Sequence, residues 1–285
     1  MADLLFRSGG FIESMLKLTR FGNLVMIAFA QYFTAAFLID KQTVFDLRLF
    51  LLSLSTVVIA AAGYIINDYY DVKIDYINKP DRVVIGKSIT RRFAILFHVL
   101  LSVCGIALGV YLSWRITALN VASVFLLWIY SNSLKRMPFI GNLTVALLTG
   151  AAVYSAEMLY HSGNALIVVF AIFAMFMTLI REIIKDIEDL KGDNTFGCKT
   201  LPIVWGIRRT KIVLYAIVII FSITVVLLNY QFRALPFRYQ IIFLFLPLLV
   251  LIWKLIRADT RLDFIHLSTL CKVIMLMGIA SMAFV

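Results

Sequence analysis

Nine of the 16 acidic residues are concentrated in two short segments of the chain, residues 67–92 and 181–211. Each segment contains three aspartates at the spacing i, i+3 and i+7, which are Asp68, Asp71 and Asp75 in the first and Asp186, Asp189 and Asp193 in the second. At about 100° per residue, the carboxylates of each set lie within about 60° of one another on one helix face. Like charges so placed repel one another unless a cation binds there. The spacing therefore predicts two cation-binding helix faces.

The ligand types in these segments favour a hard divalent cation. Carboxylate oxygens, with the amide oxygen of Asn67 beside the first set, suit Mg²⁺ or Ca²⁺. Mg²⁺ commonly binds through a few carboxylates together with substrate phosphates. Basic residues that would contact phosphate flank both sets, and they are Lys73, Lys79, Arg82, Lys87, Arg91, Arg92, Lys185, Lys191 and Lys199, with Lys135 and Arg136 in a further segment. These residues predict a diphosphate held by magnesium, with some of the bases serving only topology.

The composition places the elements that carry these residues in a membrane. Of 285 residues, 62% are hydrophobic and 15% are charged, against about 25% charged in ordinary soluble domains. The mean hydropathy is +0.95. A water-soluble fold could not hide so much apolar surface, because a large part of any fold faces its solvent. A disordered chain, a coiled coil and a conventional soluble enzyme are therefore excluded.

The hydrophobic segments predict an all-α polytopic membrane protein that forms a single domain over residues 1–285. A bilayer-spanning helix needs roughly 20 mostly apolar residues. Nine stretches qualify, at about 21–39, 49–66, 93–113, 117–134, 141–160, 165–181, 212–230, 238–256 and 265–285. The acidic segments follow the second and the sixth stretch, so four crossings separate them and both lie on the same side of the membrane.

The distribution of positive charge predicts the orientation of the nine spans. Lys and Arg accumulate in cytoplasmic loops. With the N-terminus cytoplasmic and the C-terminus outside, 21 of the 27 Lys and Arg residues lie on the cytoplasmic side and five lie outside. The net charge of +11 is thus a topology signal and does not indicate nucleic-acid binding. The predicted location is the cell (inner) membrane, with the acidic segments facing the cytoplasm. If the second and sixth spans are neighbours, the two acidic segments line one cavity.

Five motifs in order along the chain resemble those of the UbiA superfamily of intramembrane prenyltransferases. They are NDYYDVKID at residues 67–75, DLKGD at 189–193, NKPDR at 78–82, YSNSLKR at 130–136 and RFGN at 20–23. The resemblance covers nearly the whole chain, and nine spans is the architecture of that family. One departure is Val83, where many relatives continue the loop with proline.

The resemblance implies a Mg²⁺-dependent transfer of a prenyl group from an allylic diphosphate to a lipophilic acceptor in the membrane. Metal ligands would be Asn67, Asp68, Asp71, Asp75, Asp186, Asp189 and Asp193. Substrate-binding residues would be Arg20, Asn23, Lys79, Arg82 and Lys199. Tyr130 would face the allylic cation with its ring, and Lys135 would bind the diphosphate as it leaves.

The sequence identifies the acceptor substrate less clearly than the prenyl diphosphate. The motifs most resemble the geranylgeranylglycerol-phosphate geranylgeranyltransferase branch, which forms an ether bond of archaeal-type lipids; the alternative is prenylation of an aromatic acid for a quinone. A cation transporter is disfavoured because its acids usually lie at the bilayer midplane. A CDP-alcohol phosphotransferase is disfavoured because its DGxxAR signature is missing from the sequence. The acceptor, the prenyl chain length and the oligomeric state stay open.

Overall fold

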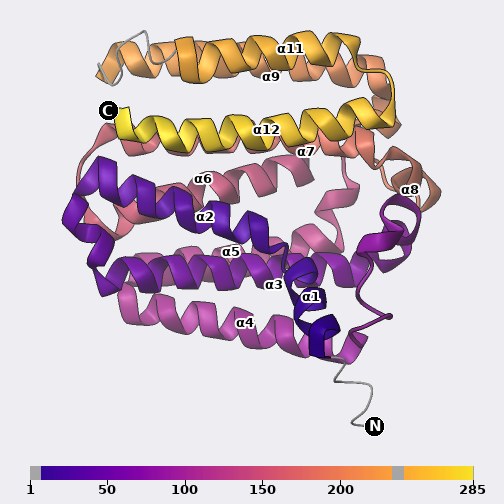
Figure 1. Cartoon of the computed structure of the whole chain (residues 1–285), viewed down its shortest axis with the longest axis horizontal. Helices are drawn as coiled ribbons and strands as arrows, with labels where there is room; N and C mark the ends of the chain where they lie inside the picture. The colour runs from indigo at the N-terminus through magenta and orange to yellow at the C-terminus, as the bar shows by residue number, and fades with distance from the viewer. Residues whose placement is uncertain (1–7, 233–240, 285) are drawn as a thin grey trace. The chain divides into compact units, whose positions relative to one another are not determined.

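The computed structural model describes residues 8–232 and 241–284, which fold into helices joined by short segments. Figure 1 labels the helices in chain order. The α-helices are α1 (Ser8–Leu18), α2 (Phe21–Thr34), α3 (Leu47–Asn78), α4 (Arg91–Leu112), α5 (Trp114–Asn132), α6 (Ile140–Tyr160), α7 (Ala165–Glu188), α8 (Leu190–Thr195), α9 (Leu201–Phe232), α11 (Leu246–Arg257) and α12 (Arg261–Ser281). Short π- or 3₁₀-helical turns are η1 (Ala35–Ile39), η2 (Lys41–Phe45), η3 (Pro80–Arg82), η4 (Leu134–Arg136), η5 (Ile241–Phe245) and η6 (Met282–Phe284).

Within the described residues, eight helices are long and apolar enough to cross a membrane. They coincide with eight of the nine stretches expected from the sequence, so the polytopic all-α class is confirmed. The remaining stretch, 238–256, begins in residues outside the described part of the chain and continues as η5 and α11. A count of nine spans therefore stays a prediction.

Exposed apolar side chains show why these helices need lipid as their solvent. On α4, Leu96, Leu100 and Val103 are 67%, 61% and 61% exposed, and their spacing puts them on one helix face. An apolar face of this kind is unfavourable in water and ordinary in hydrocarbon. Backbone groups in hydrocarbon must be satisfied within the segment, which the helices achieve.

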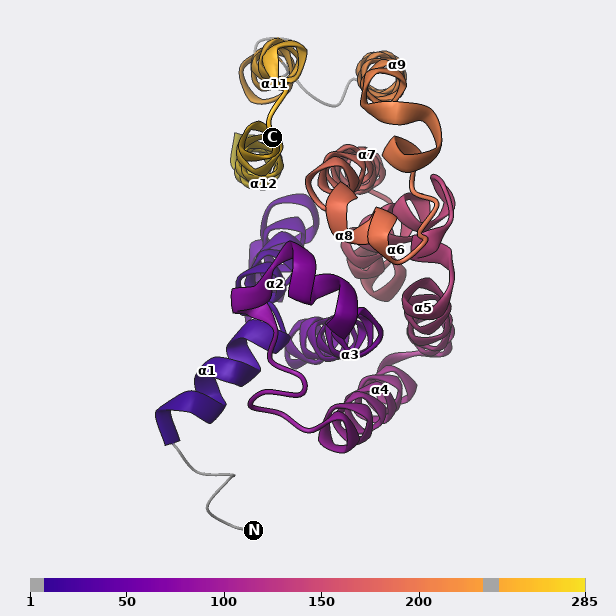
Figure 2. The same cartoon turned by 90° about the vertical axis from the view of Figure 1, so that its right-hand side faces the viewer.

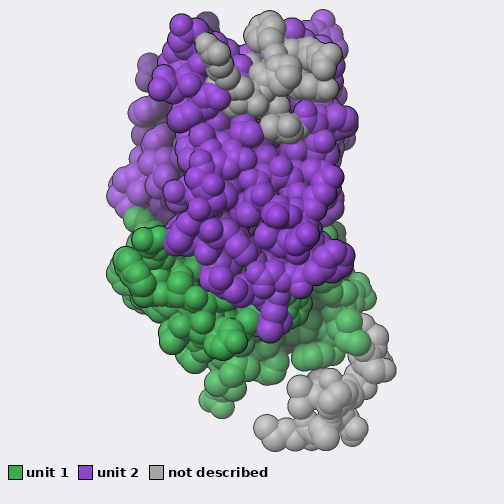
Figure 3. Space-filling model, turned by 90° about the vertical axis from the view of Figure 1, so that its left-hand side faces the viewer, with its two compact units in different colours: residues 1–28, 50–134 green, residues 29–49, 135–285 purple. Residues whose placement is uncertain are grey.

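The chain divides into two compact units, residues 1–28 with 50–134 and residues 29–49 with 135–285 (Figure 3). In the first unit, small and polar residues join α3, α4 and α5. Asn120 donates from Nδ2 to Ser55 Oγ at 2.7 Å and to the Gly105 carbonyl at 2.9 Å. The missing side chain of Gly105 lets α4 approach α3, because a Cβ there would lie 2.4 Å from Ile59 Cγ1. Close backbone approach and interhelical hydrogen bonds are how membrane helices associate.

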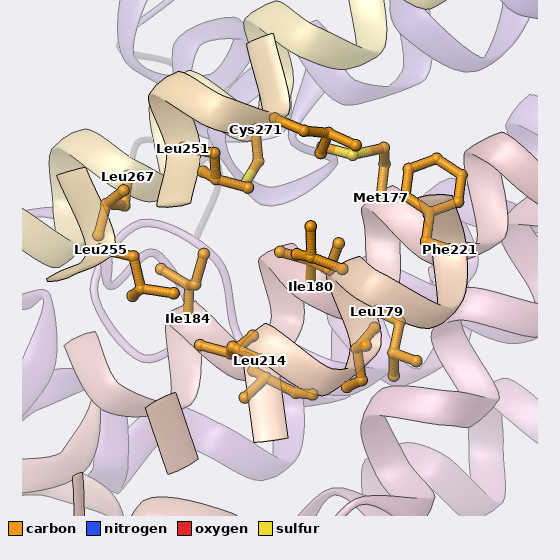
Figure 4. Close-up of a cluster of buried hydrophobic side chains, with 14 of the residues drawn as sticks. Met177, Leu179, Ile180, Ile184, Leu214, Phe221, Leu251, Leu255, Leu267 and Cys271 are labelled. Atoms are coloured by element: carbon orange, nitrogen blue, oxygen red, sulfur yellow. The ribbon is translucent and has the colours of Figure 1, made fainter. Parts of the chain in front are cut away.

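In the second unit, α7 is the central helix. It packs against α6, α9 and α12, and α11 packs against α9 and α12 (Figures 1 and 2). Figure 4 shows Met177, Ile180 and Ile184 of α7 in a buried cluster with Leu251 of α11 and Cys271 of α12. One face of α7 is therefore committed to apolar packing, which leaves its opposite face for polar residues.

Candidate active site

The first acidic set lies on one continuous helix, as its spacing predicts. Helix α3 continues to Asn78, twelve residues beyond the expected end of the span at residue 66. Asp68, Asp71 and Asp75 therefore share a face of α3 near its C-terminal end. The helix thus extends past the apolar span, and regular helix geometry holds the three carboxylates in register.

Arg20 anchors this set from the junction between α1 and α2. Its Nη2 donates to Asp68 Oδ1 at 2.8 Å, and its guanidinium lies 4.9 Å from the centre of the Tyr64 ring. Arg20 has a φ of 51°, a left-handed conformation that turns the chain between the two helices. Burial by itself would lower the pKa of Arg20, but the charge of Asp68, its hydrogen bond to Arg20, and the nearby Tyr64 and Asp75 together outweigh burial and raise that pKa, so the guanidinium stays charged.

Asn23 and Tyr64 complete this arrangement. Asn23 Nδ2 donates to the Tyr64 hydroxyl at 3.3 Å. Tyr64 precedes Asp68 by four residues, one helix turn, so both lie on the same side of α3. The structure thus brings the predicted substrate residues Arg20 and Asn23 to the first acidic set, with Tyr64 between them.

The loop after α3 is held by its own apolar residues. Lys79 precedes the turn η3 and Arg82 is its last residue. The Arg82 N–H donates to the Lys79 carbonyl at 2.9 Å. The residue after the turn, Val83, has a φ of −68° and is buried. That φ is the value that proline imposes. Val83 therefore has a backbone φ that a proline at this position would also adopt.

The second acidic set is divided between two helices, which corrects the expectation of one continuous face. Helix α7 ends at Glu188, Asp189 has φ −92° and ψ 4°, and α8 begins at Leu190. Asp186 therefore belongs to α7 and Asp193 to α8. At the break, Arg261 Nε of α12 donates to the Glu188 carbonyl at 3.1 Å. This tertiary contact competes for a carbonyl that an uninterrupted helix would use internally.

Two carboxylates of this set contact side chains of α6 and α7. Asp186 Oδ2 accepts a hydrogen bond from Asn142 Nδ2 of α6 at 2.9 Å. Asp189 Oδ2 lies 3.2 Å from Lys185 Nζ, one turn earlier on α7. The Asp193 carbonyl accepts from the Cys198 N–H at 3.0 Å, which closes the segment after α8. A neutral amide thus orients the carboxylate of Asp186, and a positive charge orients that of Asp189, before any substrate binds.

Two of the predicted basic residues, Lys135 and Lys199, lie in segments of the second unit that a backbone hydrogen bond joins. The Lys199 N–H donates to the carbonyl of Arg136 in η4 at 2.8 Å. Lys135 is half-buried in this turn, whereas Arg136 is exposed. Tyr130 lies in the last turn of α5, in the first unit.

Three residues were missed by reasoning from the sequence. Asn142 was not singled out, although a polar amide in an apolar span is the signal that would have found it. Arg181 was counted only as a topology charge because the span was expected to end there; it lies inside α7, and its side chain is 16% exposed. Thr178 has a buried hydroxyl in the same helix.

The donors fit magnesium bound together with a diphosphate. Every predicted ligand offers oxygen, which suits a hard cation. Among residues 8–232 and 241–284, no three Asp, Glu, His or Cys side chains come close enough to hold a metal ion by themselves. Mg²⁺ commonly takes one or two carboxylates and completes its shell with water and substrate phosphate.

Comparison with known proteins gives consistent matches over most of the chain. The model of the UbiA prenyltransferase family matches residues 28–270. The digeranylgeranylglyceryl phosphate synthase of Saccharolobus solfataricus is 36% identical over 216 residues, 73% of this chain and 76% of that protein. The synthase of the same name from Sulfurisphaera tokodaii is 31% identical over 254 residues, 87% of this chain and 89% of that protein.

Solved structures show the same fold. One, described as concerning digeranylgeranylglyceryl phosphate synthase in membranes, has a TM-score of 0.72 and 22% identity and covers 96% of this chain and 97% of its own. A UbiA homologue from Archaeoglobus fulgidus, bound to GPP and Mg²⁺, has a TM-score of 0.67 and 18% identity and covers 95% of this chain and 100% of its own. Since the family model spans far more than half of the residues, this chain belongs to the UbiA prenyltransferase family.

Proposed function

We propose that this chain transfers a geranylgeranyl group from its diphosphate to geranylgeranylglyceryl phosphate and so forms the second ether bond of an archaeal-type lipid. The observation that carries the proposal is the likeness to digeranylgeranylglyceryl phosphate synthases over 73% to 87% of the chain. Both relatives carry that name, which favours the glycerol phosphate acceptor over an aromatic acid. A prenyltransferase fold also removes the support for a cation transporter.

The carboxylates are proposed to hold Mg²⁺ together with the diphosphate. The ligands would be Asn67, Asp68, Asp71 and Asp75 on α3 and Asp186, Asp189 and Asp193 on α7 and α8. Bound Mg²⁺ would neutralise the negative charge that develops on the leaving diphosphate. This assignment rests on the all-oxygen donor types, on the helical spacing of the first set, and on the place of the second set at the end of α7 and in α8.

Basic residues would add direct contacts to the diphosphate. Lys79, Arg82 and Lys199 lie beside the acidic sets along the chain, and charge-assisted hydrogen bonds to phosphate are among the stronger ones in proteins. Lys135 would follow the diphosphate as it separates, because an ammonium on a flexible stem adapts to a moving charge. Arg20 and Asn23 would position the substrate from the start of α2.

In the bond-forming step, the acceptor hydroxyl oxygen bonds to C1 of the prenyl group while the bond from C1 to the diphosphate oxygen breaks. The hydroxyl proton is released, and the products are the ether and diphosphate. The allylic carbon carries positive charge in between and must be kept from water. The ring of Tyr130 is proposed to stabilise that charge through its π face.

The reaction is proposed to face the cytoplasm. The chain forms a multi-pass membrane protein, and the bias of Lys and Arg to one set of segments supports a cytoplasmic N-terminus and an external C-terminus in the cell (inner) membrane. A reporter fused after residue 37 or 160 should read as external, and one fused near residue 90 or 200 as cytoplasmic. An external reading near residue 90 would contradict the orientation.

The test of function is an acceptor panel. Purified protein with radiolabelled geranylgeranyl diphosphate and Mg²⁺ is given either geranylgeranylglyceryl phosphate or a set of hydroxybenzoic acids. Labelled ether lipid should form together with diphosphate, and excess EDTA should stop both. Label transferred only to an aromatic acid would contradict the proposed acceptor. Neither product, with the protein folded and Mg²⁺ present, would contradict prenyl transfer to these acceptors.

A further inference from the structure

The second half of α7 carries a polar face, buried at Thr178 and half-buried at its charged residues, that continues beyond the acidic set. Met177, Leu179, Ile180, Ile183, Ile184 and Ile187 belong to the apolar cluster of the second unit. The intervening residues Thr178, Arg181, Glu182, Lys185 and Asp186 occupy the remaining arc, about 140° wide at about 100° per residue. Ionisable groups within a membrane helix are costly and usually serve function.

Arg181 and Thr178 form the deep end of this face. They lie about 60° apart around the helix and about 4.5 Å apart along it. Arg181 precedes Asp186 by five residues, which places it about 7.5 Å further along α7, away from the acidic end. Arg181 is also near enough to α12 for its charge to act on Cys271.

Both residues present a buried polar atom that has no hydrogen-bond partner among the described residues. Arg181 Nη1 pairs with Glu182 Oε1 at 2.5 Å, but Arg181 Nε is buried without a partner there. The Thr178 hydroxyl is likewise buried without a partner in the described part of the chain. Other threonines in these helices, such as Thr144 and Thr149, donate to the carbonyl four residues earlier. Buried donors without acceptors cost free energy, so each one needs an explanation.

The geometry of the arginine indicates what would satisfy these donors. Because Glu182 engages Nη1, the edge formed by Nε and Nη2 is turned elsewhere, and this edge binds an oxyanion with two parallel hydrogen bonds. A hydroxyl one turn away adds a third donor. Three donors on one partly buried helix face suit the oxygens of a phosphate group.

We propose that Arg181 and Thr178 bind the phosphate of the acceptor lipid. The inference rests on the proposed function, in which the acceptor bears its phosphate on the carbon beside the reacting hydroxyl. The donor diphosphate is assigned to the carboxylates at the end of α7, so a cationic site deeper along the same face is suited to a second anion. This site would set both the orientation of the acceptor and the preference of the enzyme for a phosphorylated acceptor.

The test compares two acceptors that differ only in the phosphate, geranylgeranylglyceryl phosphate and geranylgeranylglycerol. Arg181→Gln should lower kcat/KM for the phosphorylated acceptor by about 10- to 100-fold, the usual effect of losing a charged hydrogen-bond pair. The kcat/KM for the phosphate-free acceptor and the KM for geranylgeranyl diphosphate should stay within about twofold. Arg181→Lys should recover only part of the loss, because it restores the charge and not the fork.

Further variants guard against a general folding defect. Thr178→Val should lower kcat/KM for the phosphorylated acceptor by about 3- to 10-fold, and Thr178→Ser should restore it. Arg209→Gln, which removes one positive charge from an exposed position on α9, is the matched control and should change neither acceptor. Melting temperatures in detergent check that each variant is folded.

Three results would overturn the inference. Equal losses for both acceptors in Arg181→Gln would make Arg181 a structural residue. A raised KM for geranylgeranyl diphosphate with unchanged acceptor preference would assign Arg181 to the donor. Wild-type protein without a preference for the phosphorylated acceptor would leave prenyl transfer intact and remove the site. Wild-type protein inactive with both glycerol acceptors would instead refute the proposed function, and the inference with it.

Discussion

Arg20 reaches from the junction of α1 and α2 to Asp68 on α3, with its Nη2 atom 2.8 Å from Asp68 Oδ1 and its guanidinium over the Tyr64 ring. One side chain thus links the first motif in the chain to the first acidic set. The ion pair orients a carboxylate that is proposed to bind Mg²⁺, so we expect Arg20 to influence both metal and substrate binding.

Replacing Arg20 should therefore impair turnover even when the new residue keeps the positive charge. Arg20→Lys keeps the charge but loses the planar contact with Tyr64, and kcat/KM for the prenyl diphosphate should fall about tenfold or more. Lys17→Gln is the matched control, because Lys17 forms an exposed pair with Glu13 and should have little effect. Steady-state kinetics with varied Mg²⁺ measure this. Full activity in Arg20→Lys would show that the contact has no catalytic role.

The two acidic sets should both be essential. Asp71→Ala and Asp189→Ala should each reduce turnover by about 10³-fold or more, because each removes charge stabilisation worth several kcal/mol in the transition state. Glu13→Ala, at an exposed position on α1, should stay active. Initial rates are measured with Mg²⁺ and with excess EDTA, after equal insertion is confirmed by detergent extraction. Normal turnover in either aspartate variant would contradict the two-set assignment.

Lys135 and Arg136 offer a matched pair of adjacent positive charges. Lys135 is half-buried in η4, whereas Arg136 is exposed. Lys135→Gln should therefore lower kcat at saturating prenyl diphosphate about tenfold or more, and Arg136→Gln should lower it much less. Both substitutions remove one charge and affect topology alike. Equal, mild losses at equal expression would mean that Lys135 serves only topology.

The close approach of α3 and α4 should not tolerate an added methyl group. Gly105→Ala would place a Cβ 2.4 Å from Ile59 Cγ1 and 3.3 Å from the Ser55 carbonyl oxygen. Such overpacking commonly costs about 1–3 kcal/mol, so the melting temperature in detergent should fall. Gly22→Ala is the control, because nothing lies within 4 Å of the added atom. An unchanged melting temperature in Gly105→Ala would mean that the helices separate easily.

Asp46 should make part of the stability pH-dependent. The Arg48 N–H donates to Asp46 Oδ1 at 2.9 Å and lowers the pKa of Asp46, and the Tyr160 hydroxyl, which donates to Oδ2 at 2.8 Å, lowers it further. A carboxyl with a lower pKa in the folded state stabilises the fold above its unfolded pKa, about 3.9, and loses that contribution as pH falls below it. Melting temperatures of wild type and Asp46→Asn should therefore converge toward pH 3. A constant difference down to pH 3 would exclude this linkage.

The residue pattern alone was sufficient for the class of fold and for the first acidic set. Apolar segments of about 20 residues can be satisfied in hydrocarbon only as helices, so eight of the nine expected spans coincide with helices of the described residues, although several helices extend beyond the apolar stretch. The face shared by Asp68, Asp71 and Asp75 follows from helix periodicity, which is a local property.

Only the tertiary structure decided what holds the site residues in place. The partners of Asp68 and Asp186 are Arg20 and Asn142, which lie 48 and 44 residues away, and no local spacing specifies such pairs. The break at Asp189 likewise coincides with a contact from Arg261 on α12, where the periodicity predicted a continuous face. Arg181 could be read as a topology charge because its burial depends on the helices packed around α7. Periodicity is set along the chain, whereas burial, pairing and helix breaks are set by neighbours distant in sequence.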